Sequence, residues 1–206
     1  MKGIGNYQGA ISSYTNAIDV DTESQKQGYM KRGILYIQMR DYSQALDDFT
    51  KLIELDDFNA KAYFYRAKSL EKLKNYDDAV LSFEQVSKLS ADEYLQNNAL
   101  YEIIKIRVKQ RDFYEAYYTL QRAEKYKQKH QKLSLYQGFT EGVIFLMKRK
   151  TKKGVAMLSQ MIEKSPVLKD ESYLNSLIYI YRAYGFILLQ KFDSALKDLL
   201  KASSIK

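Results

Sequence analysis

The chain has 206 residues, of which 46% are apolar and 28% charged, and it carries a net charge of +8 with one proline and no cysteine. This composition excludes an extended disordered chain, and the lack of thiols excludes disulfides, thiolate catalysis and cysteine-ligated zinc. The charge is unevenly placed. Residues 1–90 have a net charge of −1, from 12 basic and 13 acidic residues, whereas residues 91–206 have +9, from 21 and 12.

Sets of four anchor residues recur along the chain at steps of three, four and three positions, which puts each set on one face of a helix. The small residues of the sets follow one another at 35, 34, 37, 38 and 41 residues, a period typical of stacked helical hairpins. The sets are Tyr7, Ala10, Tyr14 and Ala17; Tyr42, Ala45, Phe49 and Leu52; Tyr76, Ala79, Phe83 and Val86; Phe113, Ala116, Leu120 and Ala123; Thr151, Gly154, Leu158 and Met161; and Phe192, Ala195, Leu199 and Ala202.

A partner helix precedes every set except the first, and in most hairpins it has its own small residue, as in Arg32-Gly33-Ile34-Leu35-Tyr36 and Arg182-Ala183-Tyr184-Gly185-Phe186. The pattern predicts helices over 7–19, 26–39, 42–55, 60–73, 76–89, 94–110, 113–128, 132–149, 151–164, 171–190 and 192–204. Short polar residues at the turns within hairpins are expected to cap the helix that follows. These residues are Asp41, Asn75, Asp112 and Asp193.

With these residues in place, the chain resembles the tetratricopeptide repeat family over nearly its whole length. The resemblance implies an all-α fold, a right-handed solenoid of antiparallel helical hairpins that forms one array over residues 1–206. Its repeats would cover 1–22 (second helix only), 26–57, 60–91, 94–128, 132–166 and 171–206. The fourth repeat departs from the family pattern at Ile104 and Arg107, and Ile103, Ile104 and Val108 are expected to carry its packing.

The resemblance also implies that the first helix of each hairpin lines an inner groove. The residues at these groove positions are Met30, Ile34, Lys61, Phe64, Tyr65, Lys68, Lys72, Tyr101, Lys105, Lys109, Phe139, Val143, Tyr181, Tyr184 and Leu188, with Ile180 and Ile187 beside the last three. A basic, aromatic middle that leads into an apolar end predicts a protein partner with an acidic and apolar segment. Packing of the apolar residues against neighbouring helices is the alternative. The family's chaperone-tail-binding members hold a terminal carboxylate with a lysine and an asparagine one helical turn apart. At the corresponding turns this chain has Met30 and Ile34 in the second repeat and Phe64 and Lys68 in the third, so the pair is missing.

Two basic runs form a second candidate surface for phosphates, acidic proteins or an import receptor, unless they are plain solvated loops. They hold Lys125, Lys127, Lys129 and Lys132, and Lys148, Arg149, Lys150, Lys152 and Lys153. A basic helical-repeat protein that binds nucleic acid is therefore the alternative function. The lack of a regular set of base-reading residues disfavours it.

No enzyme, cofactor or metal site is predicted. His130 is the one histidine and stands in a lysine-rich loop, where a solvated role is expected. The pairs Asp47/Asp48, Asp56/Asp57 and Asp77/Asp78 are adjacent on helices or turns, so their side chains diverge, and they are assigned cap or surface roles.

No membrane span is predicted either, because the longest apolar stretch, from Leu177 to Leu189, contains Arg182 and is shorter than a bilayer requires. The polar sequence from Asn6 to Ser13 shows no secretory signal. An intracellular, cytoplasmic location follows as an expectation, with a cytoskeletal or other large assembly and the nucleus left open.

Apolar residues are predicted to stay uncovered at both ends of the array: Ile11 and Ile18 at one end, and Leu196, Leu199, Leu200 and Ile205 at the other. Repeat arrays need polar caps. We therefore expect a neighbouring subunit, or a second copy in a homo-oligomer, to cover at least one end; a truncated chain is the alternative. The function predicted is a non-catalytic protein-interaction scaffold, a subunit or adaptor of a larger complex.

Overall fold

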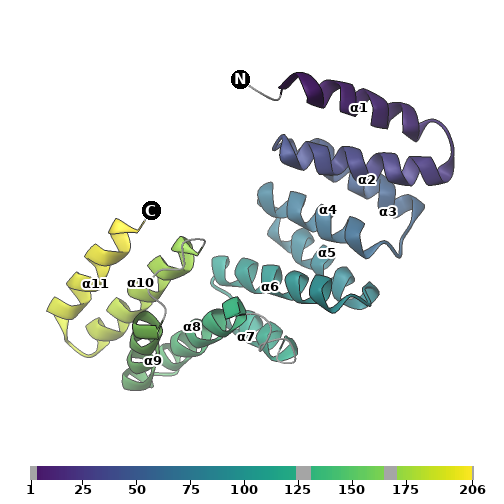
Figure 1. Ribbon diagram of the computed structural model, residues 1–206. Helices are drawn as coiled ribbons and strands as arrows, with labels where there is room; N and C mark the ends of the chain where they lie inside the picture. The colour runs from purple at the N-terminus through teal and green to yellow at the C-terminus, as the bar shows by residue number, and fades with distance from the viewer. Residues whose placement is uncertain (1–3, 124–130, 165–170, 206) are drawn as a thin grey trace. The chain divides into compact units, whose positions relative to one another are not determined.

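The computed structural model describes residues 4–123, 131–164 and 171–205, and the regular structure of this part of the chain is helical throughout (Figure 1). The chain forms two compact units, Met1–Ile106 and Arg107–Lys206. The first holds α1 (Ile4–Ile18), α2 (Thr22–Gln38), α3 (Tyr42–Leu55), α4 (Ala60–Lys72), α5 (Tyr76–Leu89) and most of α6 (Glu93–Lys109). The second holds α7 (Phe113–Arg122), α8 (Gln131–Met147), α9 (Thr151–Lys164), α10 (Ser172–Leu188) and α11 (Phe192–Ser204).

Helices that follow one another in sequence pack together as hairpins, with α2 against α3, α4 against α5, α8 against α9 and α10 against α11. The predicted ranges 42–55, 76–89, 151–164 and 192–204 agree with the structure. The beginning of α2 differs most, because Asp21 accepts a hydrogen bond from the backbone N–H of Ser24 and starts the helix at Thr22. The last residues of the range predicted for α7 lie outside the described residues.

The caps predicted at Asp41 and Asp112 are confirmed: each side chain accepts a backbone N–H three residues later at 3.3 Å. Asn75 stands at the N-cap of α5, but its side chain donates to Asp78 instead. Lys191, not Asp193, occupies the N-cap position of α11, and Asp193 lies in the first turn of that helix.

The turns within five hairpins share one backbone geometry. A residue with positive φ follows the first helix, and the next residue donates its N–H to the carbonyl five positions back, as from Asp41 to Tyr36 at 2.9 Å. This Schellman ending usually has glycine at its left-handed position. Here the residues with φ of 56° to 63° are Arg40, Lys74, Arg111, Arg149 and Gln190. The backbone geometry is therefore kept at some conformational cost in every turn.

Small residues stand where helices approach one another. Ala45, Ala79 and Ala116 have no exposed surface, and a Cβ added to Gly33 would lie 2.8 Å from the ring of Phe49. Close contacts of this kind leave no room for a larger side chain. In the fourth hairpin, the predicted packing residues Ile103, Ile104 and Val108 are buried.

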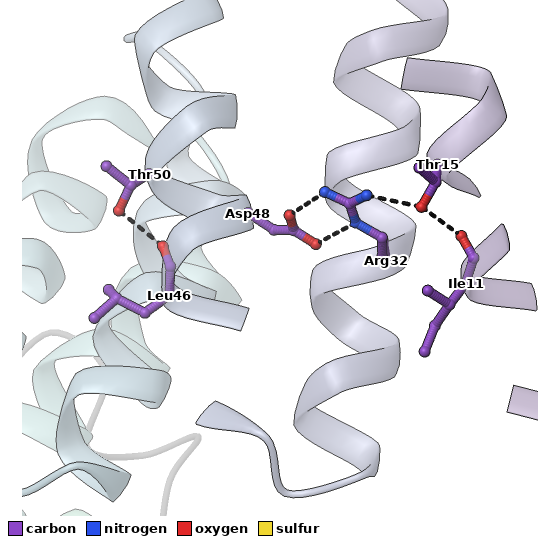
Figure 2. A network of polar contacts seen from close by, with 6 residues as sticks. All are labelled: Ile11, Thr15, Arg32, Leu46, Asp48 and Thr50. Carbon is purple, nitrogen blue, oxygen red and sulfur yellow. Dashed lines mark hydrogen bonds and ion pairs between the residues drawn. The ribbon is translucent and has the colours of Figure 1, made fainter. Parts of the chain in front are cut away.

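An arginine on the first helix of a hairpin links three consecutive helices. Arg32 of α2 donates from Nη2 and Nε to both carboxylate oxygens of Asp48 on α3, at 2.7 and 3.0 Å, and from Nη1 to the hydroxyl of Thr15 on α1, at 2.8 Å (Figure 2). Asp48 is only 4% exposed, and this burial raises its pKa, while the hydrogen bonds from Arg32 act in the opposite direction. The cap or surface role predicted for Asp48 is wrong, because its partner lies on another helix.

The same link recurs with changes in two later hairpins. Arg182 of α10 binds both oxygens of Asp198 at 2.7 Å and the hydroxyl of Ser159 on α9 at 3.2 Å. Arg66 of α4 meets a hydroxyl instead of a carboxylate, the Oγ of Ser82 at 3.1 Å. Each of the three guanidinium groups also lies over a tyrosine three residues earlier, at 5.1 to 5.6 Å from the ring centroid. These contacts hold the first helix of each hairpin in place, and with it the groove positions.

Candidate protein-binding surface

In the first unit, the aromatic groove positions pack partly on the second helices. The ring of Tyr65 stacks on Phe49 at 5.4 Å, and Phe64 meets Phe83 edge to face at 5.5 Å. Met30 packs against the core residues of α3 and α4. Ile34, Phe64 and Tyr65 are half-buried, so each presents only part of its side chain to a partner.

The lysines in the middle of the predicted groove are engaged within the chain. The Lys68 ammonium lies 3.0 Å from one carboxylate oxygen of Glu102 and 3.5 Å from Glu71, and Lys105 lies 3.0 Å from the other oxygen of Glu102. The four side chains form a network of two positive and two negative charges. The expectation of a basic middle is therefore corrected, because carboxylates from α4 and α6 offset the two lysines. Lys61 and Lys72 are exposed and Lys109 is half-buried.

Three aromatic or aliphatic groove residues turn out to be core residues. Phe139 and Val143 of α8 have no exposed surface, and Tyr101 of α6 is almost fully buried. Phe139 meets Phe113 and Tyr181 edge to face, at 5.9 and 5.7 Å. Their assignment to a partner-binding surface is wrong, and the alternative of packing against neighbouring helices holds for them. Tyr181 itself is half-buried, and this burial raises the pKa of its hydroxyl.

The groove positions of α10 carry an uncovered apolar stripe. We call Ile180, Tyr184, Ile187 and Leu188 the α10 stripe; their side chains are 40%, 49%, 44% and 46% exposed. Steps of four, three and one residues place all four on one helical face. Leu177 and Ile178 of the same helix are buried, and Arg182 holds the helix to α9 and α11. The stripe is thus a fixed surface on a well-packed helix, on the yellow-green ribbon of Figure 1.

The second basic run surrounds the turn between α8 and α9. Lys148, Arg149, Lys150, Lys152 and Lys153 are all exposed, in agreement with a surface assignment. The first run fares differently: Lys125, Lys127 and Lys129 lie outside the described residues, as does His130, and so does the side chain of Lys132. What the second run binds stays a prediction.

At the predicted ends of the array, Leu196, Leu199 and Leu200 of α11 are exposed, while Ile11, Ile18 and Ile205 are half-buried. Leu199 is 43% exposed, whereas Phe49, at the corresponding position of α3, is fully buried beneath Tyr65 of α4. Coverage of this face by another chain stays a prediction.

Metal sites and membrane-spanning helices were also sought in the part of the chain that the structure describes. Within residues 4–123, 131–164 and 171–205, no three His, Asp or Glu side chains are grouped so that they could hold a metal ion. Across the same ranges, no helix has both the length and the apolar character to cross a bilayer.

Sequence reasoning missed the arginine links and a cavity between α7 and α8 that is described below. The links had a signal: Arg32, Arg66 and Arg182 each precede an aspartate or serine by sixteen residues. The cavity had none, because the sequence pattern of α7 and α8 predicts only that helices pack and not which residues line a space between them.

Comparison with known proteins finds similarity to a repeat family over part of the chain. A family model described as tetratricopeptide repeat matches residues 30–94. Human DnaJ homolog subfamily C member 7 is 32% identical over 117 residues, which cover 54% of this chain and 23% of that protein. Serine/threonine-protein phosphatase 5 of Rattus norvegicus is 33% identical over 111 residues, 54% of this chain and 22% of that protein. The chain thus spans under a quarter of the length of these curated relatives.

Solved structures agree over a larger part of the chain. YrrB, described as a TPR protein with an unusual peptide-binding site, superposes with a TM-score of 0.62 at 18% identity and covers 94% of this chain and 92% of its own. MamA from Desulfovibrio magneticus RS-1 gives 0.63 at 13% identity, with 87% and 94% covered. At such identities the likeness shows the fold, an all-α arrangement of repeated helical hairpins.

Proposed function

Because this chain is a tetratricopeptide repeat protein, we propose that it is a non-catalytic scaffold that binds a helical, apolar segment of another protein on the α10 stripe. The exposure of Ile180, Tyr184, Ile187 and Leu188 carries the proposal. Contiguous apolar side chains on a folded surface mark interaction sites more often than they are incidental.

The spacing of the stripe suits a helix better than an extended strand. Two helices pack when rows of side chains three and four residues apart interlock. An amphipathic helix with anchors at the same spacing would cover all four residues of the stripe. Burial of apolar surface contributes about 25 cal/mol per Å², so four half-exposed side chains offer several kcal/mol before the cost of association is subtracted.

The acidic character first expected of the partner loses its support in the first unit. A carboxylate that approached Lys68 or Lys105 would compete with Glu102, which already accepts from both. Gain from the new ion pair would be offset by loss of an existing one. The proposed partner segment is therefore defined by its apolar face.

The exposed face of α11 supports the further proposal that the chain is a subunit of a larger assembly. In the first unit, α4 covers the residue of α3 that corresponds to Leu199. We expect Leu196→Ser/Leu200→Ser to abolish any concentration-dependent increase in mass seen by analytical ultracentrifugation. A wild-type chain that stays monomeric at all concentrations and with every binding partner would contradict this part.

The main experiment selects helical peptides from a phage-displayed library against the whole chain and measures their affinities. Winning sequences should share apolar residues at helical spacing, and the double variant Tyr184→Ser/Ile187→Ser should bind them about tenfold or more weakly. Leu81→Ser is the matched control, since Leu81 of α5 is also well exposed. Unchanged affinity in the double variant, or an equal loss in the control, would refute the α10 stripe as the site.

A further inference from the structure

A cavity of about 370 Å³ lies between α7 and α8 in the second unit, at the start of the turn to α9. We call it the outer pocket. Three tyrosines of α7, Tyr114, Tyr117 and Tyr118, form one wall, and Ile144 and Phe145 of α8 form the other. Tyr117 and Tyr118 meet at 6.3 Å between ring centroids, and Tyr118 is 61% exposed. The volume of the outer pocket is at the lower end of the range for ligand sites, roughly 300–1,000 Å³. This volume suits a single inserted side chain.

Lysines surround the aromatic walls. Lys148 and Lys150 line the pocket itself. The Lys148 ammonium lies 5.9 Å from the centroid of Tyr114, and that of Lys153 lies 4.4 Å from Phe145. Lys148 and Lys153 therefore lie over aromatic rings. Lys105 of the first unit also lies over a ring, that of Tyr101 at 5.3 Å, in addition to its ion pair with Glu102. A cation on an exposed ring gains only about 0.5–1 kcal/mol, so it can take a carboxylate partner at little cost.

The corresponding furrow of the first unit has the opposite arrangement of charge. There the lining residues include Arg66 and Lys51 together with Asp47, Glu54 and Asp78. In α8, Glu141 takes the position of that arginine and accepts a hydrogen bond from Gln137 at 2.8 Å. The outer pocket is therefore a cationic, aromatic version of a recurring furrow, and its charge is not a general property of the fold.

We propose that the outer pocket binds an acidic segment of a partner protein that inserts one aromatic side chain between Tyr118 and Phe145 and sets carboxylates against Lys148 and Lys150. An aromatic pair contributes about 0.5–1.5 kcal/mol beyond its buried area. Single-stranded nucleic acid needs a row of stacking rings along a basic track. One aromatic site with the Glu141 carboxylate in its wall fits a single inserted side chain better.

The test uses the full chain and two fluorescein-labelled pentapeptides, Glu-Glu-Phe-Glu-Glu and Glu-Glu-Ala-Glu-Glu, in fluorescence anisotropy. The phenylalanine peptide should bind about fivefold or more tightly than the alanine peptide, and Tyr118→Ala should remove most of that difference. Lys148→Glu/Lys150→Glu should weaken both peptides about tenfold. Lys197→Glu/Lys201→Glu, an equal change of charge on exposed residues of α11, is the control and should have little effect.

Equal affinity for the two peptides, equal loss in the control variant, or no binding would overturn the proposal. Tighter binding of an oligothymidine that displaces the phenylalanine peptide would assign the site to nucleic acid instead. The proposal shares with the proposed function only that the chain binds protein. Tyr184→Ser/Ile187→Ser should leave binding of the pentapeptides unchanged, so failure of the α10 stripe and failure of the outer pocket are separate results.

Discussion

The hairpin of α4 and α5 and the hairpin of α10 and α11 have the same internal construction and different outer surfaces. Arg66 and Arg182 occupy corresponding positions, each over a tyrosine and each bound to the second helix of its hairpin. Ala79 and Ala195 are buried in both. The groove positions differ: Phe64, Lys68, Glu71 and Lys72 in α4 correspond to Ile180, Tyr184, Ile187 and Leu188 in α10.

The difference shows which positions determine the fold and which are available for recognition. Positions that face a neighbouring helix are similar in the two hairpins, because packing and hydrogen bonds restrict them. Groove positions that no neighbouring helix covers can vary. In α4, Lys68 is paired with Glu102 and Glu71 is buried, whereas the four residues of α10 are apolar and exposed. Partner binding is therefore expected where the chain leaves its own surface unsatisfied.

Removing the side chain that the arginine binds should give the largest difference in stability loss between the two hairpins. Asp198→Ala leaves the Arg182 guanidinium largely buried without its carboxylate, and should lower the free energy of unfolding by about 3–5 kcal/mol. Ser82→Ala removes one neutral partner of Arg66 and should cost about 1 kcal/mol. Urea unfolding followed by circular dichroism measures both. Equal losses would mean that the carboxylate adds nothing to the link.

Overpacking should affect the two hairpins alike. Ala79→Leu and Ala195→Leu each place a larger side chain at a buried helix contact, and each should cost about 1–3 kcal/mol. Thermal unfolding with calorimetry gives the two values. If one site accepts leucine without loss, the hairpins do not share the packing described here.

A smaller effect, this time an increase in stability, is expected from substitutions at the turns. Lys74 and Gln190 have φ of 63° and 58°, a conformation that glycine adopts without strain. Lys74→Gly and Gln190→Gly should each raise the free energy of unfolding by up to about 1 kcal/mol, since the relieved strain is partly offset by the freedom of glycine in the unfolded chain. Replacement by alanine is the control and should bring no gain.

The smallest effect on stability should come from the α10 stripe itself. Ile187→Ser/Leu188→Ser changes exposed residues and should alter the free energy of unfolding by no more than about 0.5 kcal/mol. The same double variant in the binding assay separates recognition from folding. A large loss of stability would show that the stripe packs within the molecule.

Much of the fold could be predicted from the sequence, because the anchor sets report helical faces directly. The bounds of α3, α5, α9 and α11 and the burial of Ala45 and Ala79 follow from that spacing. Which residues are exposed at the surface was harder to predict from the sequence. The periodicity of Phe139 and Val143 says which face of α8 they share, but not that Phe113 and Tyr181 cover it.

Ion pairs between helices were the other feature that was not predicted from the sequence. Lys68 and Lys105 read as free positive charge in sequence, although Glu71 and Glu102 stand three residues from them on the same helices. The contact between Lys68 and Glu102 joins two hairpins, so it depends on how the hairpins stack. Asp48 has its partner, Arg32, on the other helix of its own hairpin, sixteen residues earlier. Local patterns determine which residues share a face, whereas charge pairing between helices depends on the tertiary arrangement.

Hydrogen–deuterium exchange of the whole chain, with and without a bound helical peptide from the selection, tests the central claim most directly. The account predicts slower exchange on binding in the segment 177–189, which holds the α10 stripe, and no change in 60–73, which holds the lysines of α4. Protection confined to 60–73, with 177–189 unchanged, would contradict it.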